Sequence, residues 1–410
     1  MNEGIAIESK MLTGAELDEG LRILPEYDIG IRKKSASERL CALQNLYRIY
    51  IPTVMSQEIY TKLYLALLRS LQKKNTIRSV MQYNQNHKRI KQNSYESIIG
   101  GSDSFTIIGP SGIGKSASIS RAISVISDSV IIKEDDAKII PCLQIQAPGD
   151  SSVKGMLVEI LRKIDEILQT NYYKNALRSH ATVDVLIGVV SSVALNHLGV
   201  LIIDEMQNIV AHKSGTTVLA TITQLINNSG ISICFVGTPE STVFFEQNLI
   251  MARRSLGLRY DMMQYDETFK RICYIILGYC YTAKAQDFDE GLLMWLYNHS
   301  GGNISVVISL IHDAQEAAII DGYDRLDTVS LTKAYEKRLS MLHSYITVPQ
   351  VIIKKQKKTT NCPDNLNKEN RVNIIENISI FEILAVSKEN NTDPIKALLS
   401  KHIQISEVTI

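Results

Sequence analysis

Eight consecutive residues have the types and spacing of a loop that binds phosphate groups: Gly109, Pro110, Ser111, Gly112, Ile113, Gly114, Lys115 and Ser116. They match the Walker A or P-loop pattern G-x-x-x-x-G-K-[ST], and they follow the apolar segment FTII and open a helical pattern. Glycine permits the tight loop whose N–H groups surround phosphates, and a helix N-terminus favours an anion. In this pattern Lys115 reaches the β- and γ-phosphates and Ser116 ligates Mg²⁺. The segment therefore predicts binding of ATP and Mg²⁺.

A second chemical signal is the Walker B segment Leu201-Ile-Ile-Asp204-Glu205, an apolar strand that ends in two carboxylates. After a Walker A segment, Asp204 is expected to hold Mg²⁺ through water, and Glu205 to polarise the attacking water. The alternative is an acidic pair at a helix N-terminus after a buried strand. Because P-loop kinases usually lack the second glutamate, the pair favours an ATPase that hydrolyses ATP to ADP and phosphate.

Two further segments supply candidate residues for the reaction. Thr238 follows the buried segment ISICFVG, where it is either a sensor of the γ-phosphate or lytic water, or an ordinary turn hydroxyl. Arg253 and Arg254 precede the last short strand, at an edge that would face the ATP of a neighbouring subunit in a ring or filament. Either is a candidate arginine finger, with Arg259 next; surface arginines on a loop are the alternative.

The elements that must position these residues are short apolar strands alternating with helices, which predicts a parallel sheet with helical crossovers. The expected strands are Phe105–Ile108, Ile139–Gln144, Val200–Asp204, Ile231–Val236 and a shorter one near Tyr260–Met263. The expected helices between them are Lys115–Ser127, Val153–Gln169, Ala181–His197 and Thr216–Asn228. The predicted fold class is α/β, an AAA+ P-loop NTPase with a parallel sheet flanked by helices.

Helical segments dominate from Glu267 to about Ile346, which predicts an all-α lid. Within it, Ser300-Gly-Gly-Asn303-Ile304 opens the helical pattern ISVVISLIHDAQEAAI. Many AAA+ lids carry a sensor arginine just after this step, whereas here Ser305 follows and neither Lys nor Arg occurs through Ala318. This departure indicates slow, regulatory hydrolysis and a site that a neighbouring subunit completes.

A helical prelude precedes the sheet. Ser35 and Glu38 have capping-box spacing, and a second helix has an apolar stripe that repeats every four residues, at Ile59, Leu63, Leu67 and Leu71. The prelude should pack on something downstream and end in an exposed connector over 82–93. In a chain of 410 residues we expect a helical N-terminal region (1–95), an AAA+ core (96–265), a helical lid (266–347), and a flexible linker with a partner-binding tail (348–410).

Composition limits the class of protein. A hydrophobic content of 45% with 21% charged residues is ordinary for a globular protein. No run approaches the roughly 20 apolar residues needed to span a bilayer, and the acidic N-terminus lacks a secretory signal, so we expect a soluble cytoplasmic protein without membrane partners. Six cysteines without a CxxC pair predict reduced thiols, and a metal other than nucleotide-bound Mg²⁺ is not expected.

The net charge of +1 gives no global case for nucleic-acid binding, so any case rests on local charge. Residues 59–95 contain no Asp or Glu but carry Lys62, Arg69, Lys73, Lys74, Arg78, Lys88, Arg89 and Lys91. This stretch is either a solvated helix face followed by a polar loop, or a surface that contacts phosphates.

Taken in order, five segments resemble the TnsC family of AAA+ transposition regulators, related to TniB and more distantly to the bacteriophage Mu B protein. They are FTIIGPSGIGKS, LIIDEMQNIV, ISICFVGTPES with ARRSLGLRY, SGGNISVVISLIHDAQEAA, and the prelude LYRIYIPTVMSQEIYTKLYLALL. The resemblance covers roughly Leu24 to Ile346. Its specificity comes from DEMQNI, VGTPES and the prelude, because replication initiators and helicase loaders share the ATPase motifs.

The resemblance implies an ATP-loaded, DNA-binding protein that forms a homo-oligomer, as a ring or filament, on duplex DNA. It would receive a target-selector protein and recruit transposase subunits through its C-terminal tail during DNA recombination, and hydrolysis would disassemble the oligomer. The resemblance also implies DNA contacts from loops near the second strand, for which Lys154, Lys174 and Arg178 are candidates. Such contacts with the DNA backbone read no base sequence.

Two alternatives stay open. One is an origin-recognition or helicase-loader-like AAA+ ATPase, which would be expected to append a winged-helix reader after the lid; the short tail favours the transposition interpretation. The other is a signalling AAA+ ATPase with a protein partner and no DNA. Binding to duplex DNA with and without ATP separates this last alternative from the TnsC interpretation.

Overall fold

The computed structural model describes residues 6–7, 11–87, 104–129, 132–133, 138–149, 152–178, 181–210, 215–242, 257–284 and 288–339. The chain divides into two units, residues 1–352 and 353–410, and all of the described residues belong to the first. Across these ranges no helix is both long enough and apolar enough to cross a lipid bilayer.

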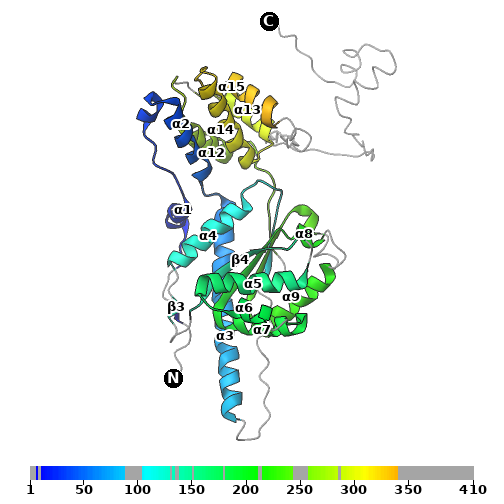
Figure 1. Ribbon diagram of the computed structural model, residues 1–410. Helices are drawn as coiled ribbons and strands as arrows, with labels where there is room; N and C mark the ends of the chain where they lie inside the picture. Colours follow the sequence, from blue (N-terminus) through cyan, green and yellow to red (C-terminus); the bar gives the residue numbers. More distant parts are fainter. Residues whose placement is uncertain are drawn as a thin grey trace, which may run out of the picture. The chain divides into compact units, whose positions relative to one another are not determined.

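A sheet of five parallel strands forms the centre of the described chain (Figure 1). Its strands lie in the spatial order β4-β5-β6-β2-β7, with bounds β2 Phe105–Ile108, β4 Ile140–Gln146, β5 Leu198–Asp204, β6 Ser232–Gly237 and β7 Leu258–Arg259. Ile108 pairs with Gly237 and Gln146 pairs with Asp204. The register therefore brings the carboxyl ends of the strands to one edge of the sheet, where open α/β sheets bind their ligands.

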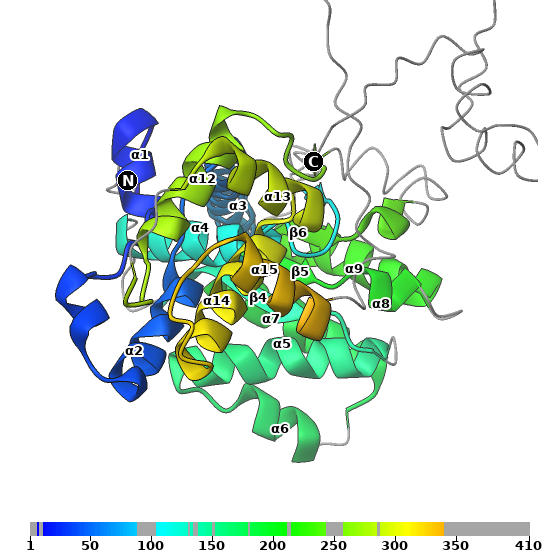
Figure 2. The ribbon, with the colours of Figure 1, turned by 90° about the horizontal axis from the view of Figure 1, so that it is seen from above.

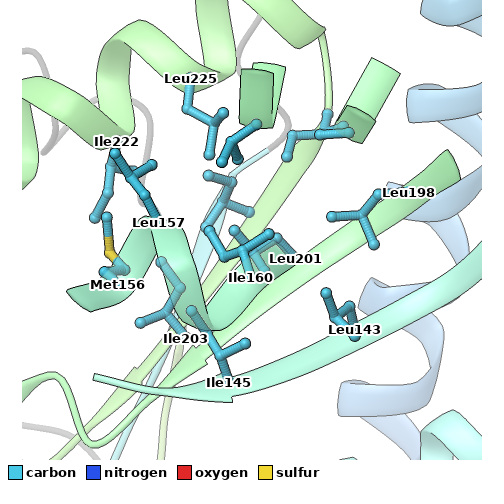
Figure 3. Packing of buried hydrophobic residues seen from close by; sticks show 14 of the residues in the cluster. Leu143, Ile145, Met156, Leu157, Ile160, Leu198, Leu201, Ile203, Ile222 and Leu225 are labelled. Carbon is cyan, nitrogen blue, oxygen red and sulfur yellow. The ribbon is translucent and has the colours of Figure 1, made fainter. Parts of the chain in front are cut away.

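Three helices cover one face of the sheet: α5 (Val153–Leu168), α7 (Val183–His197) and α9 (Gly215–Ser229). Figure 3 shows Met156, Leu157 and Ile160 of α5 packed against Leu201 and Ile203 of β5. Each of these side chains is buried. At roughly 25 cal/mol for each Å² of apolar surface removed from water, this burial is the main force that holds the helices on the sheet.

The opposite face of the sheet packs against α3 (Val54–His87) and α4 (Lys115–Ser129), and α1 (Gly14–Leu21) joins the same core by packing on these two helices. Strand β5 presents Val200 and Ile202 to this side and Leu201 and Ile203 to the other, so both of its faces are buried. That double burial explains why the strand reads as a continuous apolar run rather than an alternating one. The predicted stripe of α3 is buried in the same cluster, at Ile59, Leu63, Leu67 and Leu71.

The connector predicted at 82–93 is wrong in its first part, because α3 continues without a break to His87. The polar run there contains neither glycine nor proline, and a helix that is already nucleated gains one hydrogen bond for each residue added. Polarity alone was therefore a poor signal for its end.

The acid-free stretch of α3 does not form a single charged surface. Lys62 and Arg69 are exposed, but Lys74 is fully buried and its Nζ donates to the carbonyl oxygens of Ala194 and Leu198 at the end of α7. A cation at a helix C-terminus compensates the partial negative charge of the last carbonyls. Lys74 therefore belongs to the packing of α3 against α7 and is not part of a surface that could contact phosphates.

The second helical body comprises α12 (Glu267–Gly278), α13 (Glu290–Ser300), α14 (Ile304–Ile320), α15 (Thr328–Ala334) and the π-helical turn η4 (Tyr335–Leu339). Part of the prelude packs into the same core, namely η1 (Ile29–Lys33), α2 (Ala36–Leu43) and η2 (Gln44–Arg48). Figure 2 shows α2 beside α14. The prelude therefore belongs to two cores, since α1 and α3 belong to the core on the sheet side.

Polar contacts fix this part of the prelude to the lid. The Arg39 guanidinium makes two hydrogen bonds with the Asp324 carboxylate, at 2.5 and 2.9 Å, and donates to the Tyr281 carbonyl oxygen. Arg32 Nε donates to the Thr282 carbonyl oxygen at 2.8 Å, and Tyr27 Oη donates to that of Cys280. Bidentate arginine–carboxylate pairs combine charge with a fixed geometry. The prelude is thus locked onto the lid.

Three short strands differ from the sequence prediction. The short last strand was expected near 260–263, but β7 is Leu258–Arg259, and only the Tyr260 N–H, which donates to the Ile108 carbonyl oxygen, extends its pairing. Glycine at 257 allows the early start, because a Cβ there would lie 2.0 Å from the Thr106 carbonyl oxygen. A small antiparallel pair, β1 (Ala6–Ile7) with β3 (Ile132–Lys133), had no recognisable sequence signal.

Replacing Arg39 with alanine should lower the free energy of unfolding by about 2–4 kcal/mol, because Asp324 would keep a partly buried charge without its partner. Chemical denaturation at neutral pH measures this loss. The matched control is Arg48→Ala, since Arg48 is exposed and its hydrogen bond to Asn45 is 3.5 Å long; its effect should stay within about 0.5 kcal/mol. Equal losses in the two variants would contradict the role of Arg39.

The same pair predicts a pH dependence. Burial opposes ionisation of Asp324, but hydrogen bonds from Arg39 and the Ala283 N–H outweigh it and lower the pKa of the carboxyl. A lowered folded-state pKa stabilises the fold above the unfolded pKa of about 4, and this stabilisation is lost as pH falls through the folded pKa. The stability difference between wild type and Arg39→Ala should therefore shrink below about pH 4.

Candidate functional site

The P-loop joins the end of β2 to the start of α4, as the motif predicts. Gly112 and Gly114 have φ angles of +82° and +97°, in the left-handed region that favours glycine. At Gly109 a Cβ would lie 2.6 Å from the side chain of Ile113 and 2.8 Å from the Tyr260 carbonyl oxygen. These glycines therefore allow the chain to turn tightly at the N-terminus of α4.

Lys115 is the first residue of α4 and its side chain is buried at the centre of the loop. Its Nζ donates to the carbonyl oxygens of Gly109 and Pro110, at 2.6 and 2.8 Å. Burial lowers the pKa of this ammonium group, against the opposing effect of Asp204, Glu205 and Glu240. Its hydrogen-bond partners are neutral, so an anion entering the loop would gain a strong, partly desolvated interaction.

Asp204 ends β5 opposite the loop. Its Oδ2 accepts hydrogen bonds from Ser116 Oγ at 2.9 Å and from Gln144 Nε2 at 3.1 Å, and its Oδ1 accepts from the Glu205 N–H. A hydroxyl and a carboxylate in contact are oxygen ligands of the kind that Mg²⁺ prefers, and Mg²⁺ typically binds through one or two such groups with phosphate and water. The donor set at Ser116 and Asp204 therefore fits Mg²⁺.

Glu205 follows Asp204 with a φ of +60°, a conformation that a residue with a side chain adopts at a cost of about 1 kcal/mol or more. Backbone hydrogen bonds directly after Glu205 hold it, because Met206 N–H donates to the Val236 carbonyl oxygen and Asn208 N–H donates to the Glu205 carbonyl oxygen. Its carboxylate accepts a hydrogen bond from Gln207 Nε2. Non-glycine residues in such conformations gather at functional sites, which agrees with the predicted role of Glu205.

Thr238 follows β6 at the same edge. Its N–H donates to Gln207 Oε1 at 3.4 Å, and its side chain hydrogen-bonds Glu240, which lowers the pKa of that carboxyl. Thr238 borders the same cavity as Glu205. Its position thus suits a sensor, while its side chain also has a local partner, so the catalytic role stays a prediction.

A cavity of about 620 Å³ lies between these residues, the lid and the prelude. The P-loop, Asp204, Glu205 and Thr238 form its polar end. Most of the remaining lining comes from the prelude and the lid, including Tyr47, Ile49, Tyr50, Ile51, Ile272, Ile276, Ile304 and Ile308. A polar end at the P-loop joined to a largely apolar compartment has the form expected for a nucleotide site. Sequence reasoning missed the prelude wall, because it lies far along the chain from every motif.

The lid contacts the P-loop directly through Asn303. Its Oδ1 caps α14 by accepting from the Ser305 and Val306 N–H groups, while its Nδ2 donates to the Ser111 carbonyl oxygen at 3.1 Å. The Ser305 N–H also donates to the Gly112 carbonyl oxygen at 3.3 Å. Ser305, which occupies the place after the GGN step, therefore borders the cavity without contributing a cation.

Other predicted residues lie elsewhere. Arg253 and Arg254 fall outside the described residues, and Arg259 is exposed on β7. Lys154 of α5, with Lys174 and Arg178 of α6 (Tyr172–Arg178), is exposed and does not border the cavity. The Walker residues are thus brought together, whereas the finger and DNA contacts stay predictions.

The parallel sheet, the P-loop after β2 and the helical lid define the class: the fold is that of an AAA+ P-loop NTPase, as predicted. Residues 99–256 match the family model for TniB, described as "Bacterial TniB protein", so the predicted resemblance to TniB is confirmed over the ATPase core. No curated protein matches the chain.

Similar solved structures include two from Aeropyrum pernix. One is the ORC2 protein in ADPNP-ADP complexes, with 16% sequence identity and a TM-score of 0.41; the match covers 58% of this chain and 62% of that chain. The other is the ORC1 protein in complex with DNA, with 15% sequence identity and a TM-score of 0.41; the match covers 63% of each chain. Another similar structure is domain III of the Thermotoga maritima replication initiation protein DnaA, with 16% sequence identity and a TM-score of 0.36; the match covers 60% of this chain and 85% of that chain. The chain thus spans less than two thirds of the ORC proteins it matches.

Two substitutions of Asn303 should separate its two roles. Asn303→Asp keeps an oxygen that caps α14 but loses the donor to Ser111 and adds a negative charge beside the loop, so it should weaken binding of an ATP analogue while preserving the melting temperature. Asn303→Ala should also lose about 1 kcal/mol of stability with the cap. Fluorescent-nucleotide titration and thermal melting measure both. Wild-type affinity in Asn303→Asp would contradict a functional contact between lid and loop.

Proposed function

We propose that this chain is an ATP-dependent, DNA-binding regulator of transposition that oligomerises on duplex DNA and links a target selector to the transposase. The observation that carries the proposal is the convergence of Lys115, Ser116, Asp204 and Glu205 on one cavity, within a segment that matches the TniB family. The cavity supports the ATPase part, and the family match and the resemblance support the transposition part.

In this proposal the triphosphate of ATP lies along the P-loop and the base lies in the compartment between prelude and lid. Lys115 exchanges its carbonyl partners for the β- and γ-phosphates, which agrees with its burial and lowered pKa. Glu205 orients and polarises the attacking water. Ser116 and Asp204 would hold Mg²⁺, which would neutralise charge on the phosphate oxygens.

One feature of the lid supports slow hydrolysis that depends on assembly. The lid contributes no cation after the GGN step, where Ser305 borders the cavity. In phosphoryl transfer a guanidinium supplied by a neighbour can raise the rate about a thousandfold or more. We assign that role to Arg253 or Arg254 of an adjacent subunit, with Arg259 as the next candidate. Hydrolysis would then follow oligomer formation and lead to disassembly.

The two alternatives keep the same ATPase site but differ in partners. A helicase-loader-like ATPase would bind DNA without supporting transposition, and a signalling ATPase would bind no DNA. The TniB match over 99–256 favours transposition over both. We further propose that the tail, residues 348–410, binds transposase subunits; it lies outside the described residues.

The function is tested by two variants of the site. Lys115→Ala should abolish ATP binding and ATP-dependent retention of duplex DNA on a filter, because the phosphates lose their main cation. Glu205→Gln should bind ATP normally, lose at least about a hundredfold in phosphate release, and stay on DNA longer than wild type. ATP-dependent DNA binding that survives Lys115→Ala would contradict the proposal, as would wild-type hydrolysis by Glu205→Gln.

The DNA contacts are tested by replacing Lys154, Lys174 and Arg178 together with glutamine. Each lost phosphate contact should reduce the slope of log affinity against log salt by about 0.9, so the triple variant should lose roughly 2–3 units of slope. The matched control is Arg162→Gln, because Arg162 lies on the same helix as Lys154 but already pairs with Glu159 and Glu166. An unchanged slope in the triple variant would exclude this surface.

A further inference from the structure

Gln207 makes two contacts that connect the ends of two strands at the cavity. It opens the short helix α8 (Gln207–Val210) and borders the cavity. Its Nε2 donates to Glu205 Oε2 at the end of β5, and its Oε1 accepts from the Thr238 N–H at the end of β6. One side-chain amide thus joins the acidic strand to the predicted sensor position.

The two contacts are satisfied together in only one orientation of the amide. The carbonyl oxygen must face the Thr238 N–H, so the NH₂ group must face the carboxylate. A glutamate at this position would offer oxygen to both partners, lysine and arginine have no acceptor, and asparagine is one methylene shorter. Glutamine therefore has both the donor and acceptor and the side-chain length that these two partners require.

The backbone around Gln207 leaves the amide little freedom. Met206 and Ile209 on either side are fully buried, and Met206 N–H donates to the Val236 carbonyl oxygen. Glu205 itself is held in its left-handed conformation by the Asn208 N–H. Donor and acceptor are thus both positioned before any ligand binds.

We propose that Gln207 is a positioning residue that holds one oxygen of the Glu205 carboxylate, so that the other oxygen faces the attacking water. The inference rests on the proposed ATPase function and adds to it a residue that acts through Glu205 rather than on the phosphate. Through the Thr238 N–H, the amide also fixes the carboxylate relative to the end of β6. A small misplacement of a group that orients water costs rate without costing substrate affinity.

Two substitutions test this directly. Gln207→Met keeps the length of the side chain but removes both hydrogen bonds, and Gln207→Glu keeps the shape but places a second carboxylate against Glu205. Both should lower kcat for ATP hydrolysis by about tenfold to a hundredfold, with the larger loss in Gln207→Glu, and leave KM within about twofold. A role in packing alone would predict near wild-type kcat in both, because the volume is preserved.

A double-mutant cycle identifies the partner. In a Glu205→Gln background, Gln207→Met should change the residual rate by less than about twofold, because residues that act through one another are not additive. If Gln207→Met instead lowers the residual rate by its full factor, or weakens binding of an ATP analogue but not of ADP, Gln207 acts on the phosphate and the inference is overturned.

The matched control is Asn208→Leu. Asn208 is an amide on the same helix, but it contacts a backbone carbonyl and does not border the cavity, so kcat should stay within about twofold of wild type. Glu205→Gln that hydrolyses ATP at the wild-type rate would overturn both the proposed function and this inference. A large loss in Glu205→Gln beside unchanged kcat in Gln207→Met and Gln207→Glu would overturn this inference alone.

Discussion

The site depends on the register of one parallel sheet. Because Ile108 pairs with Gly237 and Gln146 with Asp204, the P-loop, the acidic pair and Thr238 emerge at the same edge. The hydrogen bond between Ser116 Oγ and Asp204 Oδ2 is a direct result of that alignment. A slip of one residue in β5 would exchange its two buried faces and remove Asp204 from Ser116. The burial of both faces of β5 therefore fixes the position of Asp204 beside Ser116 as well as stabilising the fold.

The prelude forms the second wall of the cavity. Helices α1 and α3 belong to the core on one face of the sheet, whereas α2 packs on the lid. The residues between α2 and α3 border the cavity. Nucleotide in the cavity would therefore contact sheet, lid and prelude at once. Asn303 adds a second connection, from the cap of α14 to the P-loop. A movement of the lid would therefore change the conformation of the P-loop that is expected to bind the phosphates.

The features that could be predicted from the sequence are those carried by contiguous residues. The P-loop and the Asp204–Glu205 pair are contiguous motifs with fixed spacing, so their positions and the central strands were predictable. Tyr47 borders the cavity although it lies far from every motif in the sequence. The contact of Asn303 with Ser111 joins residues distant in sequence, and the contacts of Gln207 depend on the direction of one amide, so no pattern encodes them. The burial of Lys74 was hidden for the same reason, because its partners lie on α7 and at the start of β5. Lys174 and Arg178 stay predictions, since their exposure alone identifies no ligand.

The central claim, that ATP held between Lys115 and Asp204 drives assembly on DNA, is tested most directly by electron microscopy of the full chain with duplex DNA, Mg²⁺ and a slowly hydrolysed ATP analogue. The account predicts ordered rings or filaments around DNA, with the nucleotide between the P-loop and β5, its base between prelude and lid, and an arginine of the adjacent subunit at the γ-phosphate. Protein that stays monomeric on or off DNA, or nucleotide bound outside this cavity, would contradict it.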